Sequence, residues 1–337
     1  MNSRDRVIKA VEYGSPDRVP NGCYALPASY NKHHGKLEKI FHRYPSDFHQ
    51  FVTSWTTVAS DSIPYRAGIN TDPWGVTWRN LNPGIFGHVV EHPLADLERL
   101  EGYEPPDPSQ LVDFGEVERS IRLNNHDHYV LGDSENFFER LHFLHGFEDT
   151  LIDLVRGKKE LLRLIDLLFD IKMRFIERWL ELDIDGIYFL DDWGTMQGLM
   201  INPVLWRRVF KPLYKEMFDK VHRSGRHVFL HSDGYVLDII PDLIEIGVDA
   251  LNIQVKLMGI ELLGERFAGK LCILADIDRQ HILPFGSMGE VEEHVRHIIQ
   301  ALGSSSGGLI SWGEVGPDVP LLNVDAMFSA FERYGKY

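Results

Sequence analysis

A histidine and an aspartate two positions apart follow an apolar run and could share a metal ion. The run Val228–His231 continues into Ser232, Asp233 and Gly234. In an extended segment, residues two apart project to the same side, so His231 and Asp233 can aim at one point. With a second carboxylate they would form a three-ligand set that leaves positions open for water or substrate. The alternative is a hydrogen-bonded core histidine beside an ordinary Asp-Gly turn.

Other polar and titratable side chains follow the remaining apolar runs of the second half of the chain. They are Asp191 and Asp192, Gln254, Asp276 and Asp278, and Glu314. Any of these aspartates could act as a general acid or base if its surroundings raised its pKa. Each could equally cap a loop or pair with an arginine. Several carboxylates that converge repel one another, which favours a bound metal or buried arginines nearby.

The elements that would position these groups alternate between strands and helices. From Ile184 onward, apolar runs bounded by Gly or Asp alternate with longer amphipathic stretches, a pattern typical of a parallel sheet. The predicted strands are Ile187–Leu190, Val228–His231, Ala250–Ile253, Leu271–Ala275 and Gly308–Ser311. A helix is predicted over Pro203–Arg223, with Asn202 as its cap and Gly225 near its end.

The first half of the chain adds three predicted strands, Val19–Tyr24, Val52–Ala59 and Tyr129–Gly132, which brings the total to eight. Trp78 and Val89–Val90 indicate a hairpin inserted after the second strand, because Asn82-Pro83-Gly84 between them is strong turn chemistry. We therefore predict one α/β domain over residues 1–337, a (β/α)8 TIM barrel with an N-terminal extension. Chemistry in such barrels lies at the C-terminal strand ends.

Composition excludes several classes of protein. The formal net charge of −15 opposes binding to nucleic acid, which requires clustered lysines and arginines. No apolar stretch reaches the length of about 20 residues that spans a bilayer, and we predict a cytoplasmic protein. Cys23 and Cys272 lie far apart in apolar runs, so buried thiols are expected rather than a disulfide.

Motifs along nearly the whole chain resemble the uroporphyrinogen decarboxylase-like family. Ser3-Arg4-Asp5-Arg6-Val7 and Pro16-Asp17-Arg18-Val19-Pro20 open the resemblance. The other matching segments are Asp191-Asp192-Trp193-Gly194-Thr195, Gly198-Leu199-Met200-Ile201, Phe210-Lys211-Pro212, His231-Ser232-Asp233-Gly234, Ile240-Pro241-Asp242-Leu243-Ile244, Gly247-Val248-Asp249-Ala250-Leu251-Asn252 and Pro317-Asp318-Val319-Pro320. The resemblance implies a (β/α)8 barrel and one of two chemistries, cofactor-free decarboxylation of a porphyrinogen or metal-dependent methyl transfer involving a corrinoid.

The chain departs from true uroporphyrinogen decarboxylases in a segment that binds substrate. Those enzymes carry an N-terminal Met-Arg-Gln-Ala-Gly-Arg stretch whose arginines hold substrate carboxylates. The corresponding region here reads Tyr24-Ala25-Leu26-Pro27-Ala28-Ser29-Tyr30 and contains no arginine. The resemblance therefore favours the methyltransferase branch.

In that branch, a His-x-Cys motif after the fifth strand and a cysteine after the eighth bind zinc. This sequence retains His231 and has Asp233 and Glu314 at the two cysteine positions. Carboxylates keep the capacity to bind a metal while making the site harder. The resemblance thus implies a divalent metal, with zinc as the expected ion, held by His231, Asp233 and Glu314.

We predict a metal-dependent methyltransferase that acts on a small methylated substrate such as a methyl ether. The methyl group would be exchanged with the corrinoid of a carrier protein, and a homo-oligomer is left open. Catalytic roles are predicted for Asp192, Asp233 and Asp278, and substrate contacts for Asp191, Trp193, Asn252 and Gln254. The alternatives are a metal-free decarboxylase or other lyase acting on a small carboxylate, and a barrel that binds a ligand without turnover.

Overall fold

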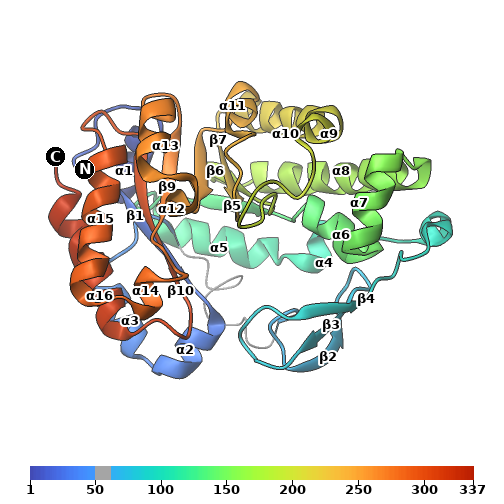
Figure 1. Cartoon of the computed structure of the whole chain (residues 1–337), viewed down its shortest axis with the longest axis horizontal. Coiled ribbons are helices and arrows are strands. Elements are labelled where there is room, and N and C mark those ends of the chain that lie inside the picture. The colour runs from blue at the N-terminus through green and yellow to red at the C-terminus, as the bar shows by residue number, and fades with distance from the viewer. Residues whose placement is uncertain (50–61) are drawn as a thin grey trace.

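A computed structural model describes residues 1–49 and 62–337 of the chain. Its centre is a curled parallel sheet of seven strands, in the order β1-β10-β9-β8-β7-β6-β5 (Figure 1). The strands are β1 (Asn21–Ala25), β5 (Leu131–Ser134), β6 (Gly186–Leu190), β7 (His227–Ser232), β8 (Ala250–Ile253), β9 (Cys272–Asp276) and β10 (Leu309–Val315). All seven overlap the predicted strands, although β10 extends far enough to include Glu314.

The strand order is that of a (β/α)8 barrel in which the described residues supply every strand except the second. The strand predicted for that position, Val52–Ala59, lies outside the described residues. Residues 47–49 lie between the two edge strands, where Asp47 N–H donates to Asn21 O at 2.9 Å and His49 N–H donates to Tyr129 O at 2.8 Å. The described part is thus an α/β half-barrel, and closure by an eighth strand stays a prediction.

Helices follow the strands, and the longer ones among them pack against the outer face of the sheet (Figure 1). The helices are α2 (Pro27–His33), α3 (Lys36–Arg43), α4 (Pro108–Leu111), α5 (Phe114–Asn124), α6 (Phe138–His145), α7 (Phe147–Arg156), α8 (Lys159–Leu180), α9 (Pro203–Val209), α10 (Lys211–Arg223), α11 (Ile240–Glu245), α12 (Val255–Met258), α13 (Ile260–Phe267), α14 (Ile282–Phe285), α15 (Met288–Leu302) and α16 (Leu321–Tyr334), with a 3-10 helix at Leu97–Gly102. In residues 1–49 and 62–337, no helix has both the length and the apolar character that crossing a membrane requires.

The single helix predicted over Pro203–Arg223 is wrong in one respect, because the structure has two helices there. The first, α9, ends at Val209, and α10 begins at Lys211 with Pro212 in its first turn. Proline lacks the N–H that would continue the hydrogen-bond ladder of a preceding helix, so the break falls where the sequence removes a donor.

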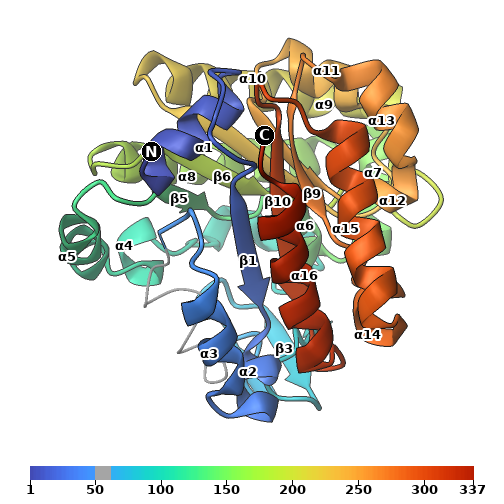
Figure 2. The same ribbon diagram turned by 90° about the vertical axis from the view of Figure 1, so that its left-hand side faces the viewer.

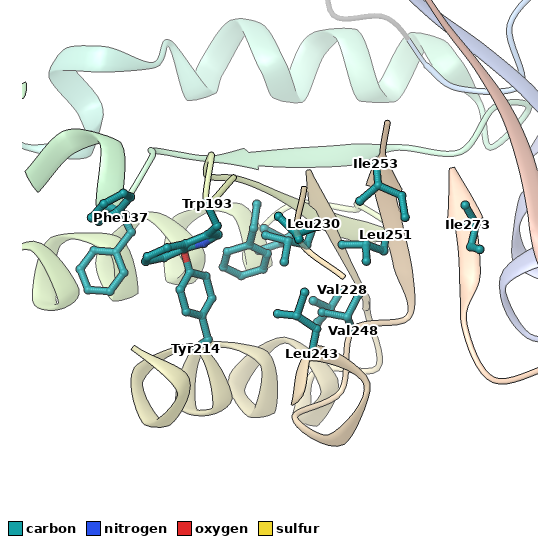
Figure 3. Close-up of a cluster of buried hydrophobic side chains, with 14 of the residues drawn as sticks. Phe137, Trp193, Tyr214, Val228, Leu230, Leu243, Val248, Leu251, Ile253 and Ile273 are labelled. Atoms are coloured by element: carbon teal, nitrogen blue, oxygen red, sulfur yellow. The ribbon is translucent and has the colours of Figure 1, made fainter. Parts of the chain in front are cut away.

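Alternate residues of each strand build two separate cores. Val228 and Leu230 of β7 point outward with Leu251 of β8 and pack against α10 and α11, as Figure 3 shows. Phe229 and the other inward-pointing residues form a second, smaller core inside the barrel, which also contains Val7, Ala10 and Val11 of α1 (Ser3–Val11). The predicted N-terminal extension therefore covers one end of the half-barrel.

The opposite end carries a small antiparallel sheet formed by β2 (Gly68–Thr71), β3 (Thr77–Asn80) and β4 (His88–Glu91). Figure 2 shows β1 running toward α2, beside which this sheet lies. The predicted hairpin is confirmed as β3–β4, and β2 is an additional strand that the sequence pattern did not indicate. In the turn, Gly84 has φ +85° and its carbonyl accepts a hydrogen bond from Ala28 N at 3.0 Å, which ties the small sheet to α2.

The two cysteines form no disulfide. Cys272 is buried in β9 and Cys23 is half-buried in β1, and both are free thiols. Burial raises the pKa of both thiols, so neither is a reactive thiolate near neutral pH.

Candidate functional site

Inward-pointing residues at the C-terminal ends of the strands form one polar cluster. The alternation that sends Val228 and Leu230 outward sends His231 and Asp233 inward. The same rule brings Asp192 after β6, Asn252 in β8 and Asp276 in β9 to this face of the sheet. The prediction that His231 and Asp233 project to one side is therefore confirmed.

Three of these residues have the spacing of metal ligands. One ligand atom each from Asp192, His231 and Asp233 lies within 4.8 Å of the others, and this is the metal-ligand group of the described residues. Nε2 of His231 lies 3.6 Å from Asp192 Oδ1 and 3.5 Å from Asp233 Oδ1. Ligands bonded at about 2 Å around a tetrahedral ion are separated by distances of this size. The nitrogen and oxygen donors thus fit a divalent ion such as zinc.

Hydrogen bonds between two loops bring Asp192 and Asp233 close together. Gly194 N–H donates to Asp233 O at 3.2 Å, and Asp233 N–H donates to Asp192 Oδ1 at 2.8 Å. Gly234 has φ +78°, and a side chain there would meet the backbone of Gly194, because a Cβ would lie 2.2 Å from the Gly194 carbonyl carbon. The close packing of the Asp233-Gly234 turn against the loop that follows β6 therefore keeps Asp192 and Asp233 together.

The orientation of His231 is fixed by Asn252. The Asn252 Nδ2 amide donates to Leu274 O at 3.0 Å, so its Oδ1 faces His231 Nδ1 at 2.6 Å and Tyr188 Oη at 2.9 Å. An amide oxygen can only accept, so both His231 Nδ1–H and Tyr188 O–H must donate. His231 Nε2 is therefore the nitrogen that faces the two carboxylates, in the orientation that a metal ligand requires.

Arg279 completes the cluster, although its sequence position in the loop after β9 gave no signal that it belongs there. Its guanidinium contacts the carboxylates of Asp233 and Glu314, and its Nε lies 3.9 Å from Asp276 Oδ2. Its side chain is 17% exposed, so it reaches the cluster from the rim of the barrel. The general expectation of a metal or a buried arginine among converging carboxylates is met in the structure by this arginine.

Burial and the charges of the cluster raise the pKa of several of its groups. Burial would lower the pKa of His231, but the nearby Asp233, Asp192 and Asp276 carboxylates outweigh it and raise that pKa above its ordinary value. Burial raises the pKa of Asp276 to about 6 against the opposing effect of Arg279. Burial, with the Asp192 charge, also raises the pKa of Glu139 on α6 well above its usual range. Glu139 is a second member of the cluster that the sequence reasoning missed.

Asp191 and Trp193, for which substrate contacts are predicted, point away from the cluster. Asp191 is 1% exposed, and its carboxylate accepts the backbone N–H of Phe138 at 2.7 Å and of Glu139 at 3.0 Å, together with the Tyr214 hydroxyl. Trp193 is fully buried between the helices, where Figure 3 shows it above Tyr214. Both side chains hold α6 and α10 against the sheet, and this arrangement leaves neither open to a substrate.

The remaining predicted residues occupy three different settings. Asp278 lies in the loop after β9, where its carboxylate caps the N–H groups of Gln280 and His281 and contacts Lys256. Gln254 Oε1 accepts the Gly234 N–H at 3.0 Å and so supports the loop that carries Asp233. Glu314 is held by Arg279 and is not one of the three residues with metal-ligand spacing.

Comparison with known families gives one match. The sequence model of the family described as uroporphyrinogen decarboxylase (URO-D) matches residues 82–334. This span includes every residue of the polar cluster. No curated protein sequence matches the chain.

Comparison with solved structures shows the same fold. A methyltransferase from Methanosarcina mazei superposes with a TM-score of 0.71 at 16% identity, and the alignment covers 99% of each chain. A chitinase from Chromobacterium violaceum gives a TM-score of 0.41 at 9% identity, over 93% of this chain and 98% of that one. A xylanase from Gloeophyllum trabeum gives 0.40 at 10% identity, over 64% and 79%. The last two likenesses are too low to bear on fold or function.

Proposed function

This chain belongs to the uroporphyrinogen decarboxylase family, and we propose that within it the protein is a metal-dependent methyltransferase. It would exchange a methyl group between a small methylated substrate, such as a methyl ether, and the corrinoid of a partner protein. The observation that carries the proposal is the metal-ligand spacing of Asp192, His231 and Asp233 at the C-terminal strand ends. The likeness of the fold to that of the Methanosarcina methyltransferase is consistent with it.

The donor set determines what a bound ion would contribute. Asp192, His231 and Asp233 would hold it, and Glu314 could join them only after releasing Arg279. A divalent ion in such a site supplies Lewis acidity, which makes a methyl group on a coordinated oxygen easier to displace. The nucleophile would come from the corrinoid of the carrier protein.

The protein's own groups would orient the ligands and manage the proton. Asn252 keeps His231 Nε2 directed at the two aspartates, so that the ligand geometry exists before the ion arrives. Glu139, whose pKa is raised mainly by burial, can carry a proton beside Asp192 and release it to the departing oxygen of the substrate. Asp192, one of the three proposed ligands, would therefore have a proton donor close to it.

Metal content tests the proposal directly. Protein purified without chelators should contain about one divalent ion per chain, and a His231→Ala variant should lose it. His222→Ala is the matched control, because His222 also pairs with an aspartate, Asp249 at 2.8 Å, but lies at the other end of the barrel. Metal-free wild-type protein that also takes up no added zinc would contradict the proposal.

Activity then tests the methyl-transfer step. The wild-type protein, supplied with zinc and a reduced corrinoid, should methylate the corrinoid from one member of a panel of methyl ethers. The change in the visible absorbance of the corrinoid reports the transfer. Loss of this signal in His231→Ala, with the His222→Ala control unaffected, is the expected pattern.

A metal-free lyase is the second candidate, and Arg279 is the observation that favours it. Its guanidinium already supplies positive charge among Asp233, Asp276 and Glu314. Asp276, with a pKa of about 6, could protonate a carbanion after loss of carbon dioxide from a small carboxylate. Release of carbon dioxide that persists in excess chelator would favour the lyase over the methyltransferase.

A further inference from the structure

Arg279 reaches the cluster from a firmly anchored backbone. Its neighbour Asp278 accepts the N–H groups of Gln280 at 3.0 Å and His281 at 3.1 Å, while the Asp278 carbonyl accepts the Leu283 N–H at 2.8 Å. These bonds hold the turn, so only the long side chain of Arg279 must be placed to reach its partners. The same side chain can leave them by rotating about its own bonds, without moving the turn.

The guanidinium divides its contacts between two carboxylates. Nη2 contacts Asp233 Oδ1, and Nη1 contacts Glu314 Oε2. The Asp233 oxygen involved is the one that lies 3.5 Å from His231 Nε2, the oxygen that a shared ion would use. Arg279 therefore holds an atom of the candidate metal site.

A divalent ion and this guanidinium cannot both keep their full attraction to Asp233 Oδ1. An ion bonded at about 2 Å to that oxygen would lie close to the guanidinium, in a partly buried region where like charges repel more strongly than in bulk water. His231 and Asp192 give the ion two other anchors, whereas Arg279 has Glu314. The carboxylate of Glu314 thus offers the arginine a place to remain when it releases Asp233.

We infer that Arg279 is a built-in competitor of the metal ion for Asp233. This inference rests on the metal site of the proposed function. In the metal-free protein, Arg279 neutralises Asp233 and Glu314 and holds the ligand geometry. When the ion binds, Arg279 gives up Asp233 and stays with Glu314 at the rim of the barrel. Ion binding and the Arg279–Asp233 contact oppose each other, and by linkage the opposition is reciprocal.

Zinc affinity of four proteins tests the competition. The proteins are wild type, Arg279→Gln, Arg279→Lys and the control Lys256→Gln, each titrated against a chromogenic zinc chelator. Lys256 contacts Asp278 on the same rim, so its substitution removes one positive charge without touching the ligand group. Arg279→Gln should bind zinc at least ten times more tightly than wild type, while Lys256→Gln should stay within about threefold.

Arg279→Lys keeps the charge and serves as the check if the glutamine variant folds poorly. It should bind zinc less tightly than Arg279→Gln and within about tenfold of wild type. If wild type binds zinc but removal of the Arg279 charge leaves the affinity unchanged or weaker, the competition is overturned and the metal site survives. If none of the four proteins binds zinc, the metal site itself fails and the competition fails with it.

A second measurement follows Arg279 directly. Modification by phenylglyoxal, read by peptide mass mapping, should proceed at least threefold faster at Arg279 when zinc is bound, because the guanidinium has then released Asp233. Arg140, which pairs with Asp72 and Glu135 and with none of the three ligand residues, is the internal reference. Equal modification of Arg279 with and without zinc would overturn the inference.

Discussion

Asparagine at position 191 should destabilise the protein strongly, although the same change at the adjacent position 192 should not. Both Asp191 oxygens are occupied by buried donors. Oδ2 accepts Phe138 N–H at 2.7 Å and the Tyr214 hydroxyl, and Oδ1 accepts Glu139 N–H at 3.0 Å and Phe137 N–H at 3.3 Å. Whichever way an asparagine amide is turned, its NH₂ group faces at least one backbone N–H, which cannot accept a hydrogen bond.

The size of the effect follows from those contacts. A buried N–H left without an acceptor costs about 1–3 kcal/mol. Buried Lys172 also loses the nearby Asp191 charge, which offsets part of the desolvation of its ammonium group. We therefore expect Asp191→Asn to lower the free energy of unfolding by about 2–4 kcal/mol.

Asp192→Asn is the matched control. The amide keeps an oxygen to accept the Asp233 N–H, which lies 2.8 Å away, and the change removes one of several carboxylates that repel each other. Its free energy of unfolding should stay within about 0.5 kcal/mol of wild type or rise, while zinc affinity is lost. Urea unfolding in the presence of chelator, followed by tryptophan fluorescence, measures both variants. A loss below about 1 kcal/mol in Asp191→Asn, or an equal loss in Asp192→Asn, would refute this reasoning.

Three further predictions concern the same face of the barrel. Because the folded-state pKa of Asp276 is raised to about 6, the folded protein binds more protons than the unfolded chain between pH 4 and 6, and its stability falls as the pH rises through that window. The free energy of unfolding of Asp276→Asn should therefore exceed that of wild type by about 1–3 kcal/mol at pH 8 and equal it at pH 4. Equal urea midpoints for variant and wild type at pH 8 would contradict this. Asn252→Leu should weaken zinc binding about 10–100-fold and release the His231 tautomer, which nitrogen NMR shifts of the imidazole would detect; unchanged shifts would argue against the orienting role. Gly234→Ala should cost more than about 2 kcal/mol in thermal unfolding, since its Cβ would lie 2.2 Å from a Gly194 backbone atom, and an unchanged melting temperature would disprove that close approach.

Sequence patterns predicted the seven described strands of the parallel sheet, because each of them has a local signature. Apolar runs ending in a polar residue located β6 through β9, and two-residue periodicity correctly put His231 and Asp233 on one side. The same periodicity implies that Asp191 and Asp192 face opposite sides. The residue types do not show which of the two faces inward, because both are aspartates. The hydrogen bond from the Tyr214 hydroxyl to Asp191 shows that Asp191 faces the helices.

The sequence did not reveal the residues whose role depends on contacts between distant parts of the chain. Arg279 follows an aspartate in a turn and looks like any loop arginine, yet its partners lie on β10 and after β7. Glu139 is an ordinary first-turn acid of α6, and its neighbourhood is set by Asp191 capping that helix from β6. An acidic residue in the first turn of a helix that follows a barrel strand was the one signal that could have located it.

The pairing of β1 with β10 has a consequence for how the chain is made. Asn21 pairs with Ser311 and Ala25 with Val315, so strands from opposite ends of the sequence are neighbours in the sheet. On the ribosome, β1 emerges long before β10, so the edge of β1 that pairs with β10 stays unpaired and open to pairing with other chains until residues 309–315 have been synthesised. Arg279 and Glu314 also emerge late. Asp233 therefore meets its cationic partner, and the polar cluster acquires its balance of charge, only after β10 has emerged.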